Sequence, residues 1–178
     1  MKLLSIDQAC NVSAWASMAN GKLENYGLID LSKLKTSEMK ISALKHEIEG
    51  IVFFEKIEVV SLEDIQYQGM LNAYKPLAML FGVLTNYLFE QEILYFPVNQ
   101  ATWKASCGIT GVKGRDAQKQ AAKEFVLNQY KLDIDSYMSE NYPQIQARAK
   151  KKNDYDLADV ICQAHHVTIH ELPKIQLV

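Results

Sequence analysis

Leu3-Leu4-Ser5-Ile6-Asp7 and Val59-Val60-Ser61-Leu62-Glu63 share one pattern: two apolar residues, a serine, an apolar residue and an acid. Short apolar runs of this kind are consistent with buried β-strands. In open α/β sheets, sites are built where strands reach their carboxyl ends. If the two strands are neighbours in register, Asp7 and Glu63 project from the same edge of the sheet. Strands also end in polar residues for no functional reason, so this pair of strands alone leaves both interpretations open.

The stretch Asp156-Leu-Ala-Asp159 adds two acids near the start of an otherwise apolar helix. A spacing of three residues puts both carboxylates on one face of that helix. Acids near a helix N-terminus are commonly caps and dipole partners, which is an alternative role for Asp154 and Asp156. Asp159 lies too far into the helix for that role.

Four converging carboxylates, Asp7, Glu63, Asp156 and Asp159, would repel one another and raise one another's pKa values. A hard divalent cation resolves this repulsion, because Mg²⁺ or Mn²⁺ takes carboxylate oxygens and keeps positions open for phosphate and water. Two such ions, about 4 Å apart, would hold the attacking and leaving oxygens of a phosphodiester displacement. The sequence therefore predicts a two-metal site for phosphodiester hydrolysis without a nucleophilic side chain.

The rest of the chain predicts an α/β fold, with a mixed sheet flanked by helices. Asn20-Gly21 is a strong hairpin signal, so the first strands are expected to be antiparallel. Residues 131–153 show no clear period and are expected to form an excursion on the surface. Residues 1–178 are expected to form a single domain. We expect strands at 2–7, 12–18, 26–31, 58–63 and 93–98, and helices at 36–54, 72–90, 101–107, 115–130 and 154–170.

Composition excludes several classes of protein. With 48% hydrophobic and 22% charged residues, the chain can bury an ordinary core and is not mainly disordered. Its 3 cysteines, Cys10, Cys107 and Cys162, form no CxxC pair and are typical of free thiols in a reducing compartment. No apolar run approaches the roughly 18 residues that span a bilayer, and the start of the chain does not fit a signal peptide. We therefore expect a cytoplasmic protein with no membrane partner.

The net charge of −2 hides an uneven distribution, because residues 101–153 carry an excess of five positive charges. A local excess of Lys and Arg can attract a polyanion even when the whole chain is slightly acidic. A solvated helical face would show the same excess, so charge alone does not distinguish DNA binding from a soluble surface.

The ordered acids Asp7, Glu63 and Asp156-x-x-Asp159 resemble the catalytic acids of RNase H-like nucleases. Within that group the chain resembles the RuvC-type Holliday junction resolvases, in particular those encoded by phages, over nearly its whole length. Asp156-x-x-Asp159, followed by a helix of small and apolar residues, is the most specific element. Bacterial members usually follow the first acid with Pro-Gly, whereas here Gln8-Ala9 follow.

The resemblance implies an RNase H-like mixed five-stranded sheet, with three antiparallel strands followed by parallel ones. It also implies a homodimer that nicks two strands of a four-way DNA junction and holds its metal ions, Mg²⁺ or Mn²⁺, with the four acids. The helix at 72–90, which is apolar on more than one face, would match the dimer helix of the family. Residues expected to contact DNA are Lys104, Lys113, Arg115 and Lys119, then Arg148, Lys150, Lys151 and Lys152 at the end of the excursion, and Tyr67, which could stack on an unpaired base.

Three functions remain open at this stage. The first is a metal-dependent endonuclease for Holliday junctions or other branched DNA. The second is a ribonuclease H or a less selective fork or flap nuclease on the same scaffold. The third, a non-cleaving nucleic-acid-binding or nucleotide-binding module, is disfavoured because four placed acids would be a liability without a metal, and the glycine-containing loop at 108–114 lacks the GK[ST] of a phosphate-binding loop.

Overall fold

The computed structural model describes residues 1–67, 69–148 and 156–175. Within these residues the centre is a five-stranded sheet in the order β3-β2-β1-β4-β5. β1, β2 and β3 are antiparallel, whereas β1, β4 and β5 run parallel to one another. The expected mixed sheet is therefore confirmed. Its strands are β1 (Lys2–Asp7), β2 (Val12–Ala19), β3 (Lys22–Asp30), β4 (Val59–Glu63) and β5 (Leu94–Val98).

The β2–β3 hairpin turns at the predicted Asn20-Gly21 pair. Both residues adopt positive φ angles, 51° for Asn20 and 78° for Gly21. A two-residue turn with positive φ at both positions has the twist that matches the flanking strands. The turn residues therefore set the antiparallel start of the sheet.

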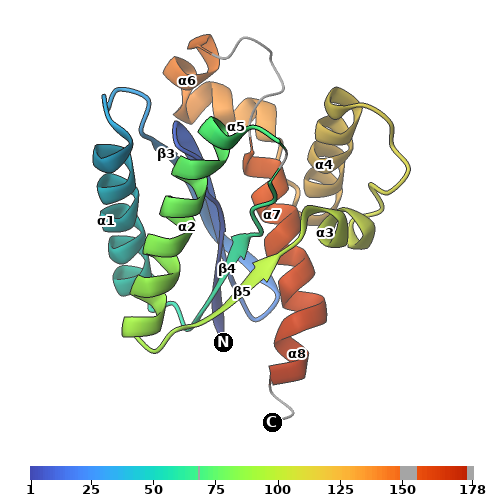
Figure 1. The fold of residues 1–178 in the computed structure, drawn as a ribbon. Coiled ribbons are helices and arrows are strands. Elements are labelled where there is room, and N and C mark those ends of the chain that lie inside the picture. The colour runs from blue at the N-terminus through green and yellow to red at the C-terminus, as the bar shows by residue number, and fades with distance from the viewer. Residues whose placement is uncertain (68, 149–155, 176–178) are drawn as a thin grey trace.

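Helices cover both faces of the sheet (Figure 1). α1 (Ser37–Glu55) and α2 (Leu71–Glu90) pack on the face that carries Leu4 and Val60. α7 (Leu157–His166) packs on the face that carries Leu3 and Val59, and α3 (Gln100–Ser106) and α4 (Arg115–Tyr130) pack against α7. We call these two sides of the sheet the α1/α2 face and the α7 face.

α7 is almost completely buried, as the predicted apolar helix requires. It begins at Leu157 and continues through a π-helical turn, Val167–Glu171, into α8 (Leu172–Ile175). Its side chains contact the sheet on one side and α3 and α4 on the other. The acids at its start are therefore held in fixed positions relative to the strands.

Residues 131–153 differ from the expected excursion, because the described part of this segment is helical and packed. It forms α5 (Ile134–Asn141) and α6 (Pro143–Arg148). Ile134 and Met138 are fully buried against the α7 face. The hydroxyl of Tyr142 accepts a hydrogen bond from Leu28 N at 3.1 Å, which ties the segment to β3. α5 buries only Ile134 and Met138, one residue in each of its two turns. Two apolar positions are too few to reveal a helical period in the sequence.

Among the described residues, none of the helices combines the length and apolar character needed to cross a membrane.

Candidate active site

The four predicted acids line one cavity of about 360 Å³ at an edge of the sheet. Asp7 and Glu63 end β1 and β4, and Asp156 immediately precedes α7. Asp159 lies in the first turn of α7, because the helix begins at Leu157; the expectation that Asp159 lies too far into the helix to interact with its N-terminus was wrong. The structure thus brings together acids that are up to 152 positions apart in the chain. The cavity is completed by Gln100, Lys104, Arg115, Gln118 and Lys119.

The register of β1 and β4 explains why Asp7 and Glu63 meet. The two strands pair in parallel, with Ser5 opposite Ser61 and Ile6 opposite Leu62. Side chains alternate between the faces of a sheet, so each serine and each acid lies on the α7 face. The shared sequence pattern therefore has a structural explanation. In both strands, the residues on the α1/α2 face are apolar, and the last two residues on the α7 face are a serine and an acid.

A buried hydrogen-bond chain connects α7 to these strands beneath the acids. Ser61 Oγ donates to Ser5 Oγ at 2.8 Å, and Gln163 Nε2 donates to Ser61 Oγ at 3.3 Å. Gln163 Nε2 also lies 3.5 Å from the carbonyl oxygen of Ile6, which it contacts as a donor. Gln163 follows Asp159 by one helical turn. These hydrogen bonds therefore fix the position of α7, and with it Asp159, relative to the ends of β1 and β4. The sequence pattern singled out the two serines but not their partner on α7.

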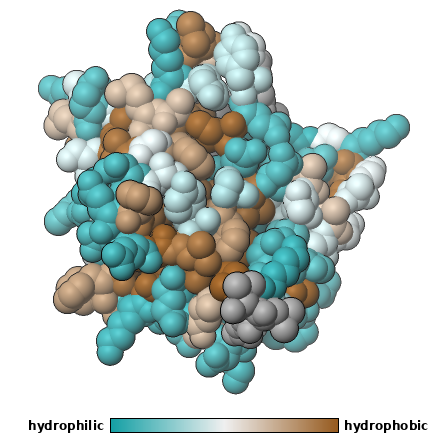
Figure 2. Space-filling model, turned by 60° about the horizontal axis from the view of Figure 1, so that its bottom comes forward, coloured by the Kyte–Doolittle hydropathy of each residue, from teal (hydrophilic) through white to brown (hydrophobic). Residues whose placement is uncertain are grey.

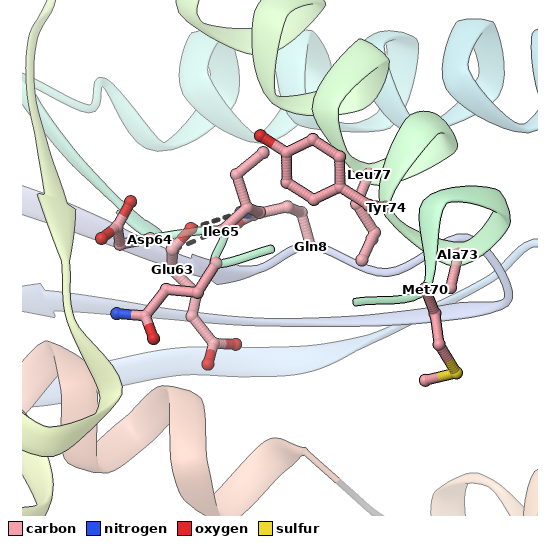
Figure 3. A pocket seen from close by; sticks show the side chains of 9 residues that line it. Gln8, Glu63, Asp64, Ile65, Met70, Ala73, Tyr74 and Leu77 are labelled. Atoms are coloured by element: carbon pink, nitrogen blue, oxygen red, sulfur yellow. Dashed lines mark hydrogen bonds between the residues drawn. The ribbon is translucent and has the colours of Figure 1, made fainter. Parts of the chain in front are cut away.

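Gln8 holds the backbone of Glu63 directly. Its side-chain Nε2 donates to Glu63 O at 2.5 Å, and its Oε1 accepts from Glu63 N at 3.1 Å (Figure 3). The backbone pairing of β1 and β4 ends at Ile6 and Leu62, so the amide of Gln8 extends that ladder by one step. We call this pair of hydrogen bonds the Gln8 bridge. Gln100 Nε2 also donates to Glu63 Oε1, at 3.2 Å.

The electrostatics of Asp7 reflect the crowding of acids. Burial raises the pKa of the Asp7 carboxyl well above its ordinary value, and the negative charges of Asp156 and Glu63 raise it further. Burial likewise raises the pKa of Asp159, although the nearby Lys119 ammonium opposes this shift. Perturbed carboxylates gathered in a cavity are a common feature of functional sites.

Lys119, which the sequence analysis placed among the DNA contacts, is buried in the structure and is not exposed to solvent as a surface contact would be. Its ammonium is buried and lies 2.5 Å from Asp156 Oδ1 and 2.5 Å from Asp159 Oδ2. Burial by itself lowers the pKa of Lys119, but Asp159 and Asp156 outweigh it, so the pKa is raised. Lys119 shares one face of α4 with the buried residues Ala122 and Val126, and this spacing could have indicated that it points inward. Lys119 therefore neutralises the two acids of α7.

The other residues predicted to contact DNA fall into three groups. Lys104 and Arg115 line the cavity, and Lys104 Nζ donates to Gln118 Oε1 at 2.9 Å. Lys113 is exposed in the loop before α4, and Tyr67 is exposed beyond the end of β4. Arg148 does not line the cavity.

Arg148 instead forms an ion pair with Asp30 at 2.5 Å and donates to Ser32 Oγ, so it ties α6 to the end of β3. This pairing gives Arg148 a role in the fold. The predicted contacts of Lys150, Lys151 and Lys152 lie outside the described residues.

The chemistry of the donor set fits a divalent cation. As the side chains stand, no three acids, cysteines or histidines among the described residues are spaced to hold one ion, and the Lys119 ammonium lies between Asp156 and Asp159. Asp7, Glu63 and Asp156 nevertheless provide carboxylate oxygens on one cavity, where burial, together with the charges of Asp156 and Glu63, raises the pKa of Asp7. Asp7 and Glu63 would hold a metal ion, and Asp156 and Asp159 would join them if Lys119 moved aside.

Comparisons with known proteins agree with this architecture. No protein-family model and no curated protein matches the sequence. Among solved structures, RuvC of T. thermophilus in complex with a Holliday junction substrate is similar, with a TM-score of 0.70 and 12% identity over 96% of this chain and 94% of that chain. A second structure of Thermus thermophilus RuvC gives a TM-score of 0.69, with 11% identity over 99% and 97% of the two chains.

The yeast mitochondrial Holliday junction resolvase Ydc2 gives a TM-score of 0.63, with 12% identity over 99% of this chain and 84% of that chain. These likenesses cover essentially the whole chain. The chain therefore has the RNase H-like fold of the RuvC-type Holliday junction resolvases.

Proposed function

We propose that the protein is a metal-dependent DNA endonuclease that cuts Holliday junctions or other branched DNA. The observation that carries this proposal is the cavity in which Asp7, Glu63, Asp156 and Asp159 meet from two strands and one helix. The fold supports it, because one similar structure is RuvC in complex with a Holliday junction substrate and another is the Holliday junction resolvase Ydc2.

In the proposed reaction, water displaces one oxygen of a phosphodiester, so that one P–O bond forms and one breaks. Two ions of Mg²⁺ or Mn²⁺ in the site would supply the Lewis acid and the activated water. Asp7, Glu63, Asp156 and Asp159 would hold the metal ions once Lys119 releases the last two acids. The Gln8 bridge keeps Glu63 at a fixed distance from the end of β1. Lys119, which balances the α7 acids in this structure, would turn toward the phosphate once metal binds.

The proposed DNA contacts follow from the charges around the cavity. Lys104 and Arg115 line the same cavity as the acids, so they are placed to bind the phosphate that is cut. Lys113, exposed before α4, would contact a neighbouring phosphate. Tyr67, which is 60% exposed and packs edge-on against Tyr74 at 5.4 Å, would stack on an unpaired base.

We also propose a homodimer formed through α2. Met79 and Phe89 on this helix are 52% and 78% exposed, whereas Phe81 packs into the core of the α1/α2 face. Figure 2 shows the side of the molecule that brings the lower end of Figure 1 forward, with hydrophobic residues interspersed among hydrophilic ones. Phe89→Glu is therefore the informative variant, because it places a charge on an outward position without disturbing the core. Light scattering that finds a monomeric wild-type protein contradicts the dimer.

The decisive experiment offers the protein a four-way junction, a fork, a linear duplex and an RNA–DNA hybrid, each with Mg²⁺, Mn²⁺ or no metal. We expect the junction to be nicked fastest, with strict metal dependence. Glu63→Gln keeps the shape of the side chain and should abolish nicking, while its junction affinity in a gel shift stays within about twofold, because affinity rests mainly on phosphate contacts. Cleavage of the hybrid alone would replace this proposal with a ribonuclease H.

A further inference from the structure

Three polar side chains are buried within the apolar core between the sheet and α7. Ser5, Ser61 and Gln163 are at most 1% exposed, and we call them the buried trio. The surrounding core is apolar, with neighbours such as Leu3 and Val160. Apolar side chains of similar shape could fill the same space at nearly the same stability and would need no hydrogen bonds. The polarity of the trio therefore requires an explanation other than stability.

The trio takes one residue from each of the three elements that carry the candidate metal ligands. Each serine precedes by two residues the acid that ends its strand, and residues two apart share one face of a sheet. Gln163 follows Asp159 by four residues, which is about one helical turn. Gln163 is not among the described residues that line the cavity of the acids, so it acts on them only through the backbone.

Hydrogen bonding makes the packing of α7 on the strands directional. Gln163 Nε2 donates to Ser61 Oγ at 3.3 Å and lies 3.5 Å from Ile6 O, and Ser61 Oγ donates to Ser5 Oγ at 2.8 Å. Apolar contact is non-directional, whereas a hydrogen bond weakens steeply once its geometry is lost. A small slide of α7 along the sheet would therefore leave the Gln163 amide unpaired in the core, where such a group is costly.

The position of α7 matters because the ligand set is divided between α7 and the strands. Asp7 and Glu63 belong to the strands, whereas Asp156 and Asp159 move with α7. Mg²⁺ requires near-octahedral coordination at about 2.0–2.1 Å, whereas Ca²⁺ accepts about six to eight oxygens at roughly 2.3–2.6 Å in a flexible arrangement. A ligand set whose two halves are fixed relative to each other can therefore distinguish the two ions, and one whose halves slide cannot.

We infer that the buried trio makes the site selective for Mg²⁺ over Ca²⁺, because it holds the acids of α7 in a fixed position relative to those of β1 and β4. This inference rests on the proposed function and adds the residues that determine which ion the site accepts. Gln163 is a positioning residue in this scheme, since it links α7 to both strands.

Metal binding without DNA tests the inference independently of activity. Mg²⁺ alone and Ca²⁺ alone are titrated into wild type and Gln163→Met, and each apparent affinity is read from the rise in melting temperature. Methionine keeps the length of the side chain and removes its amide. We expect the affinity for Mg²⁺ to fall about tenfold, as is typical when support of a metal ligand is lost, and the affinity for Ca²⁺ to change less than about twofold.

A fully apolar variant separates positioning from stability. Gln163→Met alone should lower the melting temperature by about 3–10 °C, because it leaves buried acceptors without their donor. Ser5→Ala and Ser61→Ala combined with Gln163→Met remove the remaining polar partners and should recover part of this loss. The preference for Mg²⁺ should not return with the stability, because apolar contacts leave α7 free to slide.

Cys162→Ala is the matched control on the same helix. Cys162 is fully buried next to Gln163, but its Sγ lies 3.9 Å from Ala122 O of α4, on the side away from the strands. The variant should lower the melting temperature through lost burial and should keep the wild-type preference for Mg²⁺ over Ca²⁺.

The outcomes separate this inference from the proposed function. The trio serves the fold alone if Gln163→Met keeps the wild-type preference, if Cys162→Ala loses it equally, or if the apolar variant regains it together with stability. A wild-type protein without a preference for Mg²⁺ also contradicts the inference. The nuclease proposal stands in each of these cases as long as branched DNA is cut. If the wild-type protein cuts no branched DNA with Mg²⁺ or Mn²⁺, the proposed function itself is wrong.

Discussion

The two faces of the sheet are built from the same strands but from different kinds of side chain. On the α1/α2 face, Leu4 and Ile6 of β1 pack against buried apolar residues such as Leu44 and Leu84. On the α7 face, the alternate positions of β1 are Leu3, Ser5 and Asp7, which become progressively more polar toward the cavity. The buried Lys119, Asp159 and Gln163 belong to this second side.

This difference shows how one strand can contribute both to the stability of the fold, through its apolar face, and to the candidate active site, through its polar face. Apolar burial contributes free energy in proportion to area and needs no partner geometry. Buried polar groups are costly unless each finds a hydrogen bond or an opposite charge. The α7 face carries such groups where metal and phosphate would be handled, and the α1/α2 face supplies stability that does not depend on them. Substitutions on the two faces should therefore separate activity from stability.

The largest effect is expected for Asp7→Asn. Loss of a metal ligand should reduce junction nicking at least about 10³-fold, or about 4 kcal/mol of transition-state stabilisation. The same change should raise thermal stability at pH 7 in EDTA, because burial and the neighbouring acids make the ionised Asp7 unfavourable. Nicking assays and thermal melts of the two proteins check both effects.

The sign of the pH dependence follows from the raised pKa of Asp7. A folded-state pKa above the unfolded value means that the folded state binds the proton more strongly, so the wild type loses stability as pH rises through this range. Asp7→Asn lacks this loss. Its advantage in melting temperature should therefore be small in acid and grow as pH rises toward neutrality. An advantage that is equal at every pH would mean that Asp7 is not repelled by its neighbours.

The next effect concerns Lys119→Met. Removal of one partner from a buried ion pair leaves the acids uncompensated and should cost about 3–5 kcal/mol in EDTA. Mg²⁺ or Mn²⁺ should restore more stability to this variant than to the wild type, because the ion no longer competes with the ammonium. Melting temperatures with and without metal measure this difference.

Lys123→Met is the control for that experiment. Lys123 lies one turn later in α4 and pairs with Asp135 at 2.6 Å, outside the cavity of the acids. Its loss should destabilise the protein without any recovery in metal. Equal recovery in both variants would mean that the metal acts elsewhere, and the assignment of the acids as its ligands would be wrong.

A smaller change in stability, with no change in chemistry, is expected on the α1/α2 face. Leu44 is fully buried in α1, and Leu44→Ala should cost about 2–4 kcal/mol through lost burial and the cavity left behind. The nicking rate of the folded protein should stay within about twofold, because surrounding structure transmits little to the α7 face at this distance. A rate that falls in parallel with stability would contradict the separation of the two faces.

The sequence correctly predicted the features of this structure that depend on local patterns of residues. The shared pattern of Leu3–Asp7 and Val59–Glu63 indicated that Asp7 and Glu63 would meet if the two strands paired in register, which they do. Asn20-Gly21 predicted the hairpin. A lysine in an amphipathic helix is ordinarily solvated, so the sequence did not indicate the contacts of Lys119 with Asp156 and Asp159, which the packing of α4 on α7 creates. The packing of α5 was missed because its apolar pattern spans just two turns.

The smallest effect is expected at the Gln8 bridge, which no sequence pattern indicated. Gln8→Leu keeps the approximate volume of the buried side chain and removes both hydrogen bonds to Glu63. We expect a loss of about 1–2 kcal/mol in stability and a reduction of about tenfold in nicking rate, because Glu63 is no longer held in place. The metal concentration that gives half-maximal rate should rise, while junction affinity in a gel shift is unchanged.

That rise in metal requirement distinguishes positioning of Glu63 from a general loss of stability. Asn141→Leu removes a comparable side-chain amide, which donates to Tyr137 O at 2.9 Å in α5 and lies outside the cavity. It should leave the metal requirement as in the wild type. Gln8→Glu keeps an acceptor for Glu63 N but places a buried carboxylate oxygen against Glu63 O, so it should be at least as destabilising as Gln8→Leu. If Gln8→Leu lowers the melting temperature but leaves the metal requirement unchanged, the bridge stabilises the sheet edge without positioning the acid.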